Sequence, residues 1–202
     1  MKQPKELVFL VEKKYEDHAI VLDFLPQGSP SDTRPIHLRE PVAQVIGTTF
    51  FTLLEVVPLR GVTLQPQEKI NIGKEGRDKV ERIRRRIGYE DLTAAAKAEL
   101  PAAIEKIIEE SPEKYVEFFN RAGPITTRFH QLELLPGRGK KLMWAILEER
   151  NKKPFSDFGD LEKRVKGLVN PKSYIARRVE LELQGADKYF VFVRPAKRAE
   201  RF

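Results

Sequence analysis

Two glycines and a group of cations lie close together at residues 135–141, whose sequence is LPGRGKK. Gly137 and Gly139 let the chain turn tightly and let an anion approach the main chain closely. If a helix begins directly after Gly139, its free N–H groups and its dipole face that anion. Lys140 and Lys141 add formal charge at the same end. The residue types and their spacing therefore predict a turn that binds phosphate.

Helices on both sides are needed to position this turn. Thr126 or Thr127 is suited to cap a helix that runs up to the turn. A second helix is predicted between Gly139 and Pro154, because proline cannot continue a helix interior. A third helix is predicted over residues 156–167, with Ser156 as its cap. The turn is thus expected to join two helices that pack against each other.

Residues 126–167 resemble a helix-hairpin-helix module, a unit that holds nucleic-acid backbone through main-chain N–H groups without reading bases. Two residues depart from the module's pattern. Arg138 stands where the module usually has Ile or Val, and Met143 stands where it often has Ala. We expect Arg138 to face either the ligand or solvent, and Met143 to loosen the pairing of the helices. The alternative is a helical hairpin that braces the fold and binds nothing.

A second turn with glycines and cations occurs at residues 72–77, whose sequence is IGKEGR. The turn is followed by a stretch in which Val80, Ile83 and Ile87 have helical spacing, so a basic helix is predicted there. A solvated charged helix after a turn is the alternative to an anion site. The candidate nucleic-acid-binding residues are Gly137, Arg138, Gly139, Lys140, Lys141, Lys74, Arg77, Lys79, Arg82 and Arg86.

The net charge of the chain is positive and unevenly distributed. Its 202 residues contain 37 Lys and Arg against 30 Asp and Glu, a formal charge of +7. Residues 1–73 carry 8 basic against 9 acidic residues, whereas residues 74–202 carry 29 against 21. The excess of +8 in the second part favours polyanions, through phosphate contacts and counterion release.

Catalytic and metal-binding patterns are missing from the sequence. There is no cysteine, and the three histidines, His18, His37 and His130, fall in different predicted elements. No Ser-His-Asp order, HExxH motif or paired metal-binding aspartate motif is present. Helix-hairpin-helix modules in enzymes usually hold the substrate while another part of the chain does the chemistry. We therefore predict a protein that is not an enzyme and that uses no cofactor or metal.

The same composition suggests where the protein resides. A chain without cysteine suits a reducing cytoplasm. The longest apolar-rich stretch without charge, residues 41–54, is shorter than the ~20 residues that span a bilayer. We expect a cytoplasmic protein without a membrane partner.

Residues 1–73 are predicted to form a small β-barrel. Short β-branched and aromatic runs alternate with turn residues, which is typical of barrels and sandwiches. Strands are expected at residues 7–11, 18–25, 42–57, 61–64 and 68–72. An oligonucleotide-binding (OB)-like barrel suits this length, and an SH3-like barrel is the alternative.

The rest of the chain is predicted to be mostly helical, which makes the fold α+β. Residues 74–186 form the helical domain, with Pro101 and Pro112 each in the first turn of a helix. Residues 171–184 have spacings that fit a helix or a strand. Residues 187–202 alternate as a strand that can return to the barrel, followed by a basic tail.

Several stretches together resemble an archaeal family of unknown function that has been described as nucleotide- or RNA-binding. The resemblance rests on residues 47–56 (GTTFFTLLEV), 72–74 (IGK) with the arginine-rich stretch, 89–93 (YEDLT), and the hairpin through Leu161. It implies an OB-like barrel joined to a helix-hairpin-helix domain. It implies no activity.

We expect a non-catalytic nucleic-acid-binding protein, with RNA a more suitable partner than DNA. A grip on phosphates does not by itself separate the two, because that requires readout of the 2′-OH group. The alternative is a protein–protein adaptor in a ribosomal or RNA-processing complex, with possible protein partners instead of nucleic acid.

Overall fold

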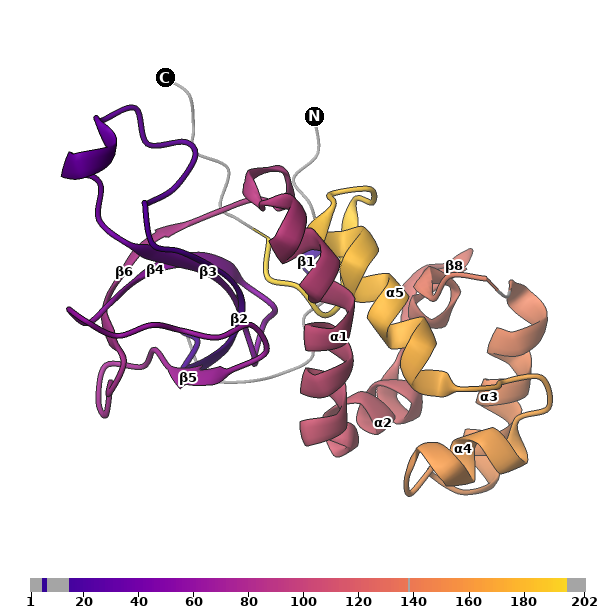
Figure 1. The fold of residues 1–202 in the computed structure, drawn as a ribbon. Coiled ribbons are helices and arrows are strands. Elements are labelled where there is room, and N and C mark those ends of the chain that lie inside the picture. Colours follow the sequence, from indigo (N-terminus) through magenta and orange to yellow (C-terminus); the bar gives the residue numbers. More distant parts are fainter. Residues whose placement is uncertain (1–4, 7–14, 138, 196–202) are drawn as a thin grey trace. The chain divides into compact units, whose positions relative to one another are not determined.

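The computed structural model of the chain describes residues 5–6, 15–137 and 139–195 (Figure 1). It is an α+β fold with two compact units. The first unit comprises Met1–Ala103 and Glu182–Phe202, and the second comprises Ile104–Leu181. The strand expected at residues 7–11, the residue Arg138 and the basic tail at residues 197–202 lie outside the described residues.

The first unit is built on a curled sheet of five antiparallel strands (Figure 1). The strand order is β5-β2-β3-β4-β6. Strands β2, β3 and β4 follow one another in the sequence and in the sheet, and β5 returns to lie beside β2, which is the Greek-key order. A curled Greek-key sheet is compatible with the predicted OB-like barrel. The strands are β2 (His18–Leu25), β3 (Val42–Gly47), β4 (Leu53–Pro58), β5 (Lys69–Asn71) and β6 (Val80–Arg86).

The interior of the curled sheet is filled by small and β-branched side chains. Alternate residues of a strand face the same side, so β2, β3 and β4 each contribute a row of apolar residues. The buried cluster consists of Ala19, Val21, Ala43, Val45, Leu54, Val56, Leu64, Ile70, Ile72 and Val80. The predicted strand at residues 61–64 is not formed, and Leu64 enters this core from a loop.

The basic helix predicted after Gly76 is wrong, because these residues form strand β6. Val80 pairs with Pro58, and Ile83 pairs with Val56. Between these two pairs β6 has one residue more than β4, namely Glu81. Val80 and Ile83 therefore lie three residues apart in the sequence, where a regular strand pair would have them two apart. That spacing imitates a helix in the sequence. The sheet therefore extends past the predicted boundary at Gly73.

Helix α1 (Ala94–Glu110) begins earlier than predicted, so that Pro101 lies inside it and not in its first turn. The hydroxyl of Thr93 accepts a hydrogen bond of 3.0 Å from the N–H of Ala96 and also donates one of 2.6 Å to Asp23. Thr93 thus caps the helix and ties its start to β2. A 3₁₀ turn, η2 (Tyr89–Asp91), precedes it, and another, η1 (Ile36–Leu38), lies between β2 and β3.

The second unit is mainly helical. Pro112 stands at the first position of α2, as predicted, and residues 171–183 form a helix, which decides between the two alternatives. Asp157, not Ser156, caps α4 through a 2.8 Å hydrogen bond from the N–H of Asp160. The elements are α2 (Pro112–Arg121), β7 (Pro124–Thr126), β8 (Phe129–His130), η3 (Gln131–Leu134), α3 (Lys140–Lys152), α4 (Phe158–Arg164) and α5 (Pro171–Leu183).

The helix predicted before the glycine turn is also wrong. Strands β7 and β8 form a short hairpin there, followed by the single 3₁₀ turn η3. Gln131 closes this hairpin twice: its N–H donates to the carbonyl of Gly123 at 2.9 Å, and its side-chain oxygen accepts the N–H of Gly123 at 3.0 Å. The run of Ile125, Thr126 and Thr127 favours strand over helix.

The C-terminal strand is shorter than predicted and does not join the five-stranded sheet. Strand β9 (Tyr189–Phe190) pairs in parallel with β1 (Lys5–Glu6). The next three N–H groups, of Val191, Phe192 and Val193, all donate to the buried carboxylate of Glu182, at 2.8, 3.0 and 2.8 Å. A carboxylate in place of a neighbouring strand therefore holds this segment. Within the described residues, no helix is both long and apolar enough to cross a membrane.

Candidate nucleic-acid interface

In the turn at residues 137–141, the described residues keep the features that predict phosphate binding. Gly137 has a φ angle of +100°, a conformation that favours glycine. Gly139 is the residue before α3, and no side chain caps this helix end. The N–H of Leu142 donates to the carbonyl of Gly139 at 3.1 Å, whereas no described residue accepts the N–H groups of Lys140 and Lys141, which leaves these two for an external anion. Arg138, the predicted contact between the two glycines, lies outside the described residues.

The cations of this turn are exposed and positioned against the helix dipole. Lys140 and Lys141 are the first two residues of α3, and the first turn contains no acidic residue. Positive charge at a helix N-terminus is unfavourable for the helix itself. Among the described residues, no carboxylate forms an ion pair with either lysine. A bound anion would relieve this repulsion.

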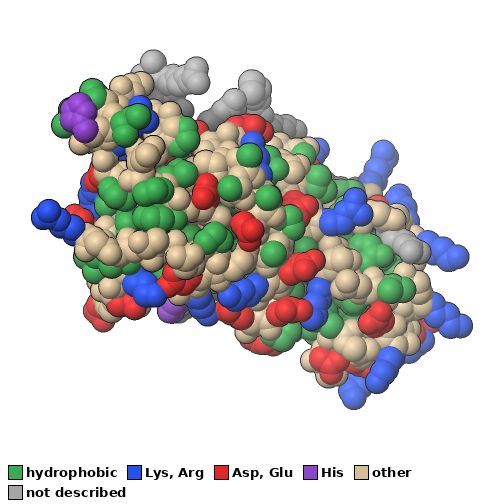
Figure 2. Space-filling view, viewed as in Figure 1, with side chains coloured by type: hydrophobic (Ala, Val, Ile, Leu, Met, Phe, Trp, Pro, Cys, Tyr) green, Lys and Arg blue, Asp and Glu red, His purple; other side chains and the backbone are tan. Residues whose placement is uncertain are grey.

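Trp144 lies one helical turn beyond these lysines, and sequence reasoning missed it. Its side chain is 64% exposed, whereas Leu142, Met143 and Ile146 of the same helix are buried. Met143 thus packs inside this unit. A helical wheel of residues 140–146 would have placed Trp144 with the lysines, opposite the apolar residues. Figure 2 shows Lys and Arg side chains projecting from the region where Figure 1 draws α3 and α4.

Lys79, which directly precedes β6, and the arginines of β6 are mostly engaged within the first unit. Lys79 pairs with Glu68, which raises the pKa of the lysine and lowers that of the glutamate. Arg82 pairs with Glu40 at 2.5 Å. Arg86 donates hydrogen bonds to the carbonyls of residues 194 and 195. The cations of the predicted basic stripe thus contact neighbouring strands and loops of the first unit.

The turn at residues 72–77 is closed by its own contacts. The N–H of Gly73 donates to the carbonyl of Asp17 at 3.0 Å and to the side chain of Asn71 at 2.9 Å. Arg77 donates through Nε to the carbonyls of Ile72 and Gly73. Lys74 lies 5.7 Å from the centre of the Tyr15 ring. Within the described residues, the N–H of Gly73 and the guanidinium of Arg77 are thus engaged by neighbouring protein groups.

The predicted residues therefore fall into two groups in different units. Gly137, Gly139, Lys140 and Lys141 come together at the start of α3. The other group lies on β6 and the turn before it, where the structure gives each cation an internal contact. The residues of these two groups are Lys74, Arg77, Lys79, Arg82 and Arg86 in the first unit, and the turn at residues 137–141 in the second.

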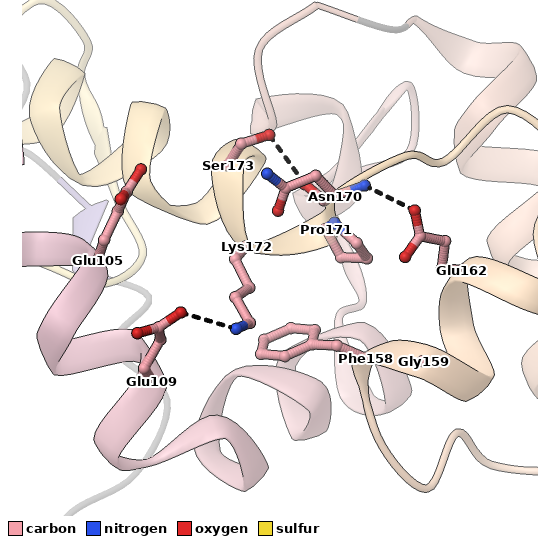
Figure 3. A pocket seen from close by; sticks show the side chains of 9 residues that line it. All are labelled: Glu105, Glu109, Phe158, Gly159, Glu162, Asn170, Pro171, Lys172 and Ser173. Atoms are coloured by element: carbon pink, nitrogen blue, oxygen red, sulfur yellow. Dashed lines mark hydrogen bonds and ion pairs between the residues drawn. The ribbon is translucent and has the colours of Figure 1, made fainter.

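A cavity of about 430 Å³ in the second unit is acidic (Figure 3). Lys172 points to Glu109 across it, with 2.9 Å between Nζ and the carboxylate. The N–H of Asn170 donates to Glu162 at 3.1 Å. The carboxylates that line the cavity repel phosphate, so the cavity does not extend the candidate interface. In the part of the chain that the structure describes, no group of three or more His, Asp or Glu residues could hold a metal.

The fold is thus an α+β architecture with a curled sheet in one unit and a cation-flanked glycine turn in the other. Residues 15–194 match a family described as "Protein of unknown function (DUF655)", and the chain belongs to this family. The uncharacterized protein MJ0038 of Methanocaldococcus jannaschii is 44% identical over 184 residues, which cover 90% of this chain and 82% of that protein. The crystal structure of Af1531 from Archaeoglobus fulgidus matches with a TM-score of 0.81 and 54% identity, and covers 89% of this chain and 100% of that one. Both relatives are archaeal, as the resemblance implied.

Proposed function

We propose that this protein binds nucleic acid, RNA in preference to DNA, through the turn at residues 137–141, and that it does so without catalysis. The observation that supports this function is the pair Lys140 and Lys141 at an uncapped helix start. Two lysines at a helix N-terminus destabilise the helix when no ligand is present, and a bound anion turns this unfavourable interaction into a favourable one. The OB-like character of the sheet belongs to the same proposal, and so does the likeness of the glycine turn and α3 to the second half of a helix-hairpin-helix module.

Binding through phosphates depends strongly on salt and weakly on sequence. A fluorescence anisotropy titration of labelled RNA and DNA, at about 50 mM and about 200 mM salt, measures both properties. The double variant Lys140→Glu/Lys141→Glu should weaken binding to every sequence. Arg60→Glu, an exposed charge reversal in the first unit, is the control and should leave affinity nearly unchanged. Absence of binding to any RNA or DNA at low salt would refute the proposal.

One observation favours the second candidate, a protein–protein adaptor. The 3₁₀ turn η1 exposes Ile36 by 60% and Leu38 by 58%. A pull-down with nuclease treatment separates the two functions. A partner that survives nuclease, is lost with Ile36→Asp/Leu38→Asp and is retained by Lys140→Glu/Lys141→Glu would establish the adaptor role.

A further inference from the structure

Trp144 is a large aromatic side chain that the fold leaves outside. Tryptophan is highly buried on average, and its exposure on a helix surface points to a contact with a partner. The buried face of α3 is already occupied by Leu142, Met143 and Ile146. The buried face of α3 is thus filled without this ring, most of which faces solvent.

The charges around Trp144 define which partner fits. Lys140 and Lys141 stand four and three residues before it, so their side chains flank the ring on the same helix face. On the other side, Glu148 is paired with Lys152 at 3.1 Å, which offsets its charge. Among the described residues, no carboxylate pairs with the two lysines on this helix face, whereas Glu148 on the same face is paired.

A flat apolar face with two adjacent cations matches the two parts of a nucleotide. The ring offers a stacking surface for a base, and the lysines offer charge to the phosphates. The α-carbons of Lys140 and Trp144 are separated by about 6 Å along the helix axis, which one nucleotide can span from phosphate to base. A duplex conceals the faces of its bases, and an aliphatic protein surface would leave both lysines without a counter-charge.

We infer that Trp144 stacks on an unpaired base of a single-stranded nucleic acid whose phosphates contact Lys140 and Lys141. This inference rests on the proposed function and specifies its ligand. Stacking on an aromatic ring tolerates every base, so the protein prefers single strands without a strong preference for sequence. The exposed aromatic distinguishes this surface from one that grips phosphates alone.

Trp144 is the only tryptophan in the chain, so its fluorescence reports on this contact directly. The experiment titrates the protein with single-stranded oligouridine and, separately, with a blunt RNA duplex of equal length. We expect the single strand to quench the fluorescence and to bind more tightly than the duplex. The affinities of variants that lack this tryptophan are measured by the anisotropy of labelled oligouridine. Trp144→Ala should weaken single-strand binding roughly 5- to 150-fold, whereas Trp144→Phe should retain most of it.

Tyr15→Ala is the matched control, because Tyr15 is 69% exposed and also lies near a lysine, in the other unit. If Trp144→Ala binds as tightly as the natural chain while Lys140→Glu/Lys141→Glu binds weakly, stacking is refuted and phosphate binding stands. Equal affinity for single strand and duplex also refutes stacking. If no nucleic acid binds at low salt, the proposed function fails together with this inference.

Discussion

The carboxylate of Glu55, which is fully buried, accepts a hydrogen bond of 2.8 Å from Nε of Arg85, its cross-strand partner on β6. Ser29 also donates to this carboxylate at 2.8 Å. A buried carboxylate is tolerated only when charge and hydrogen bonds compensate it. The basic character of β6 therefore has a structural cause that is independent of any ligand.

Glu55→Ala should destabilise the first unit, because it removes the carboxylate that pairs with Arg85 and one of the two that pair with Arg84. Loss of one partner of a buried pair costs about 3–5 kcal/mol, and partial exposure of Arg85 reduces this to about 2–3 kcal/mol. Urea unfolding measures the change. Glu90→Ala, which removes a highly exposed carboxylate, is the control and should cost much less. Equal destabilisation by the two variants would contradict the role given to Glu55.

Acidification through the range of ordinary histidine titration should weaken the second unit through His130. Its Nδ1 accepts the N–H of Leu132 at 3.1 Å, which requires the neutral ring. Burial lowers the pKa of His130, and the charge of Arg150 lowers it further. The unfolded chain then takes up the proton first, so stability is complete above about pH 6.5 and is lost as pH falls below it.

His130→Asn keeps a hydrogen-bond acceptor at this position and removes the titrating group. Urea unfolding at about pH 7.5 and about pH 5.5 brackets the ordinary histidine pKa. The natural chain should lose more stability between these values than the variant does. Identical losses in the two proteins would exclude His130 as the cause.

Glu182 should control the order of the C-terminal segment. Its carboxylate accepts the N–H groups of Val191, Phe192 and Val193, so Glu182→Gln should cost about 1.5–3 kcal/mol and expose these amides to hydrogen exchange. Amide exchange detected by NMR measures the effect.

Glu16 provides the reciprocal control, since its buried carboxylate accepts the N–H groups of Thr49, Phe50 and Thr52 at 2.8, 3.0 and 3.1 Å. Glu16→Gln should accelerate exchange at these amides first, and Glu182→Gln should accelerate exchange at residues 191–193 first. Uniform acceleration in both variants would show that the two carboxylates have no local role.

Cations on the two units should contribute unequally to nucleic-acid binding. Lys140→Gln removes an unpaired cation and should reduce the salt dependence, the slope of log K against log salt, by about one. Arg82→Gln removes a cation that Glu40 already neutralises, so its effect on the slope should be smaller. Anisotropy titrations over a series of salt concentrations determine both slopes. A larger change with Arg82→Gln would assign the interface to β6.

Local signals were sufficient where one residue decides an element. Pro112 starts α2 as predicted, because proline at the first helical position has a suitable φ angle and needs no N–H partner. Local signals were insufficient where a partner far away in the sequence determines the secondary structure. Residues 80–86 have helical spacing only because β6 contains extra residues opposite β4, and this becomes visible only once the two strands are paired.

The candidate site shows the same division. The glycines and lysines of the turn are recognisable in the sequence, because their chemistry depends on neighbours along the chain. The pairing of Lys79 with Glu68, 11 residues away, depends on the sheet. The importance of Trp144 depends on its exposure, which only the packing of α3 determines.

The parallel pairing of β1 with β9 has a consequence for the timing of synthesis. Lys5 and Glu6 precede the second unit in the sequence, and their partners Tyr189 and Phe190 follow it. Domains fold from the N-terminus as the ribosome releases them, and contacts between distant residues form slowly. The first unit therefore begins to fold before residues 104–181 are made, and it can be completed only after they have been made.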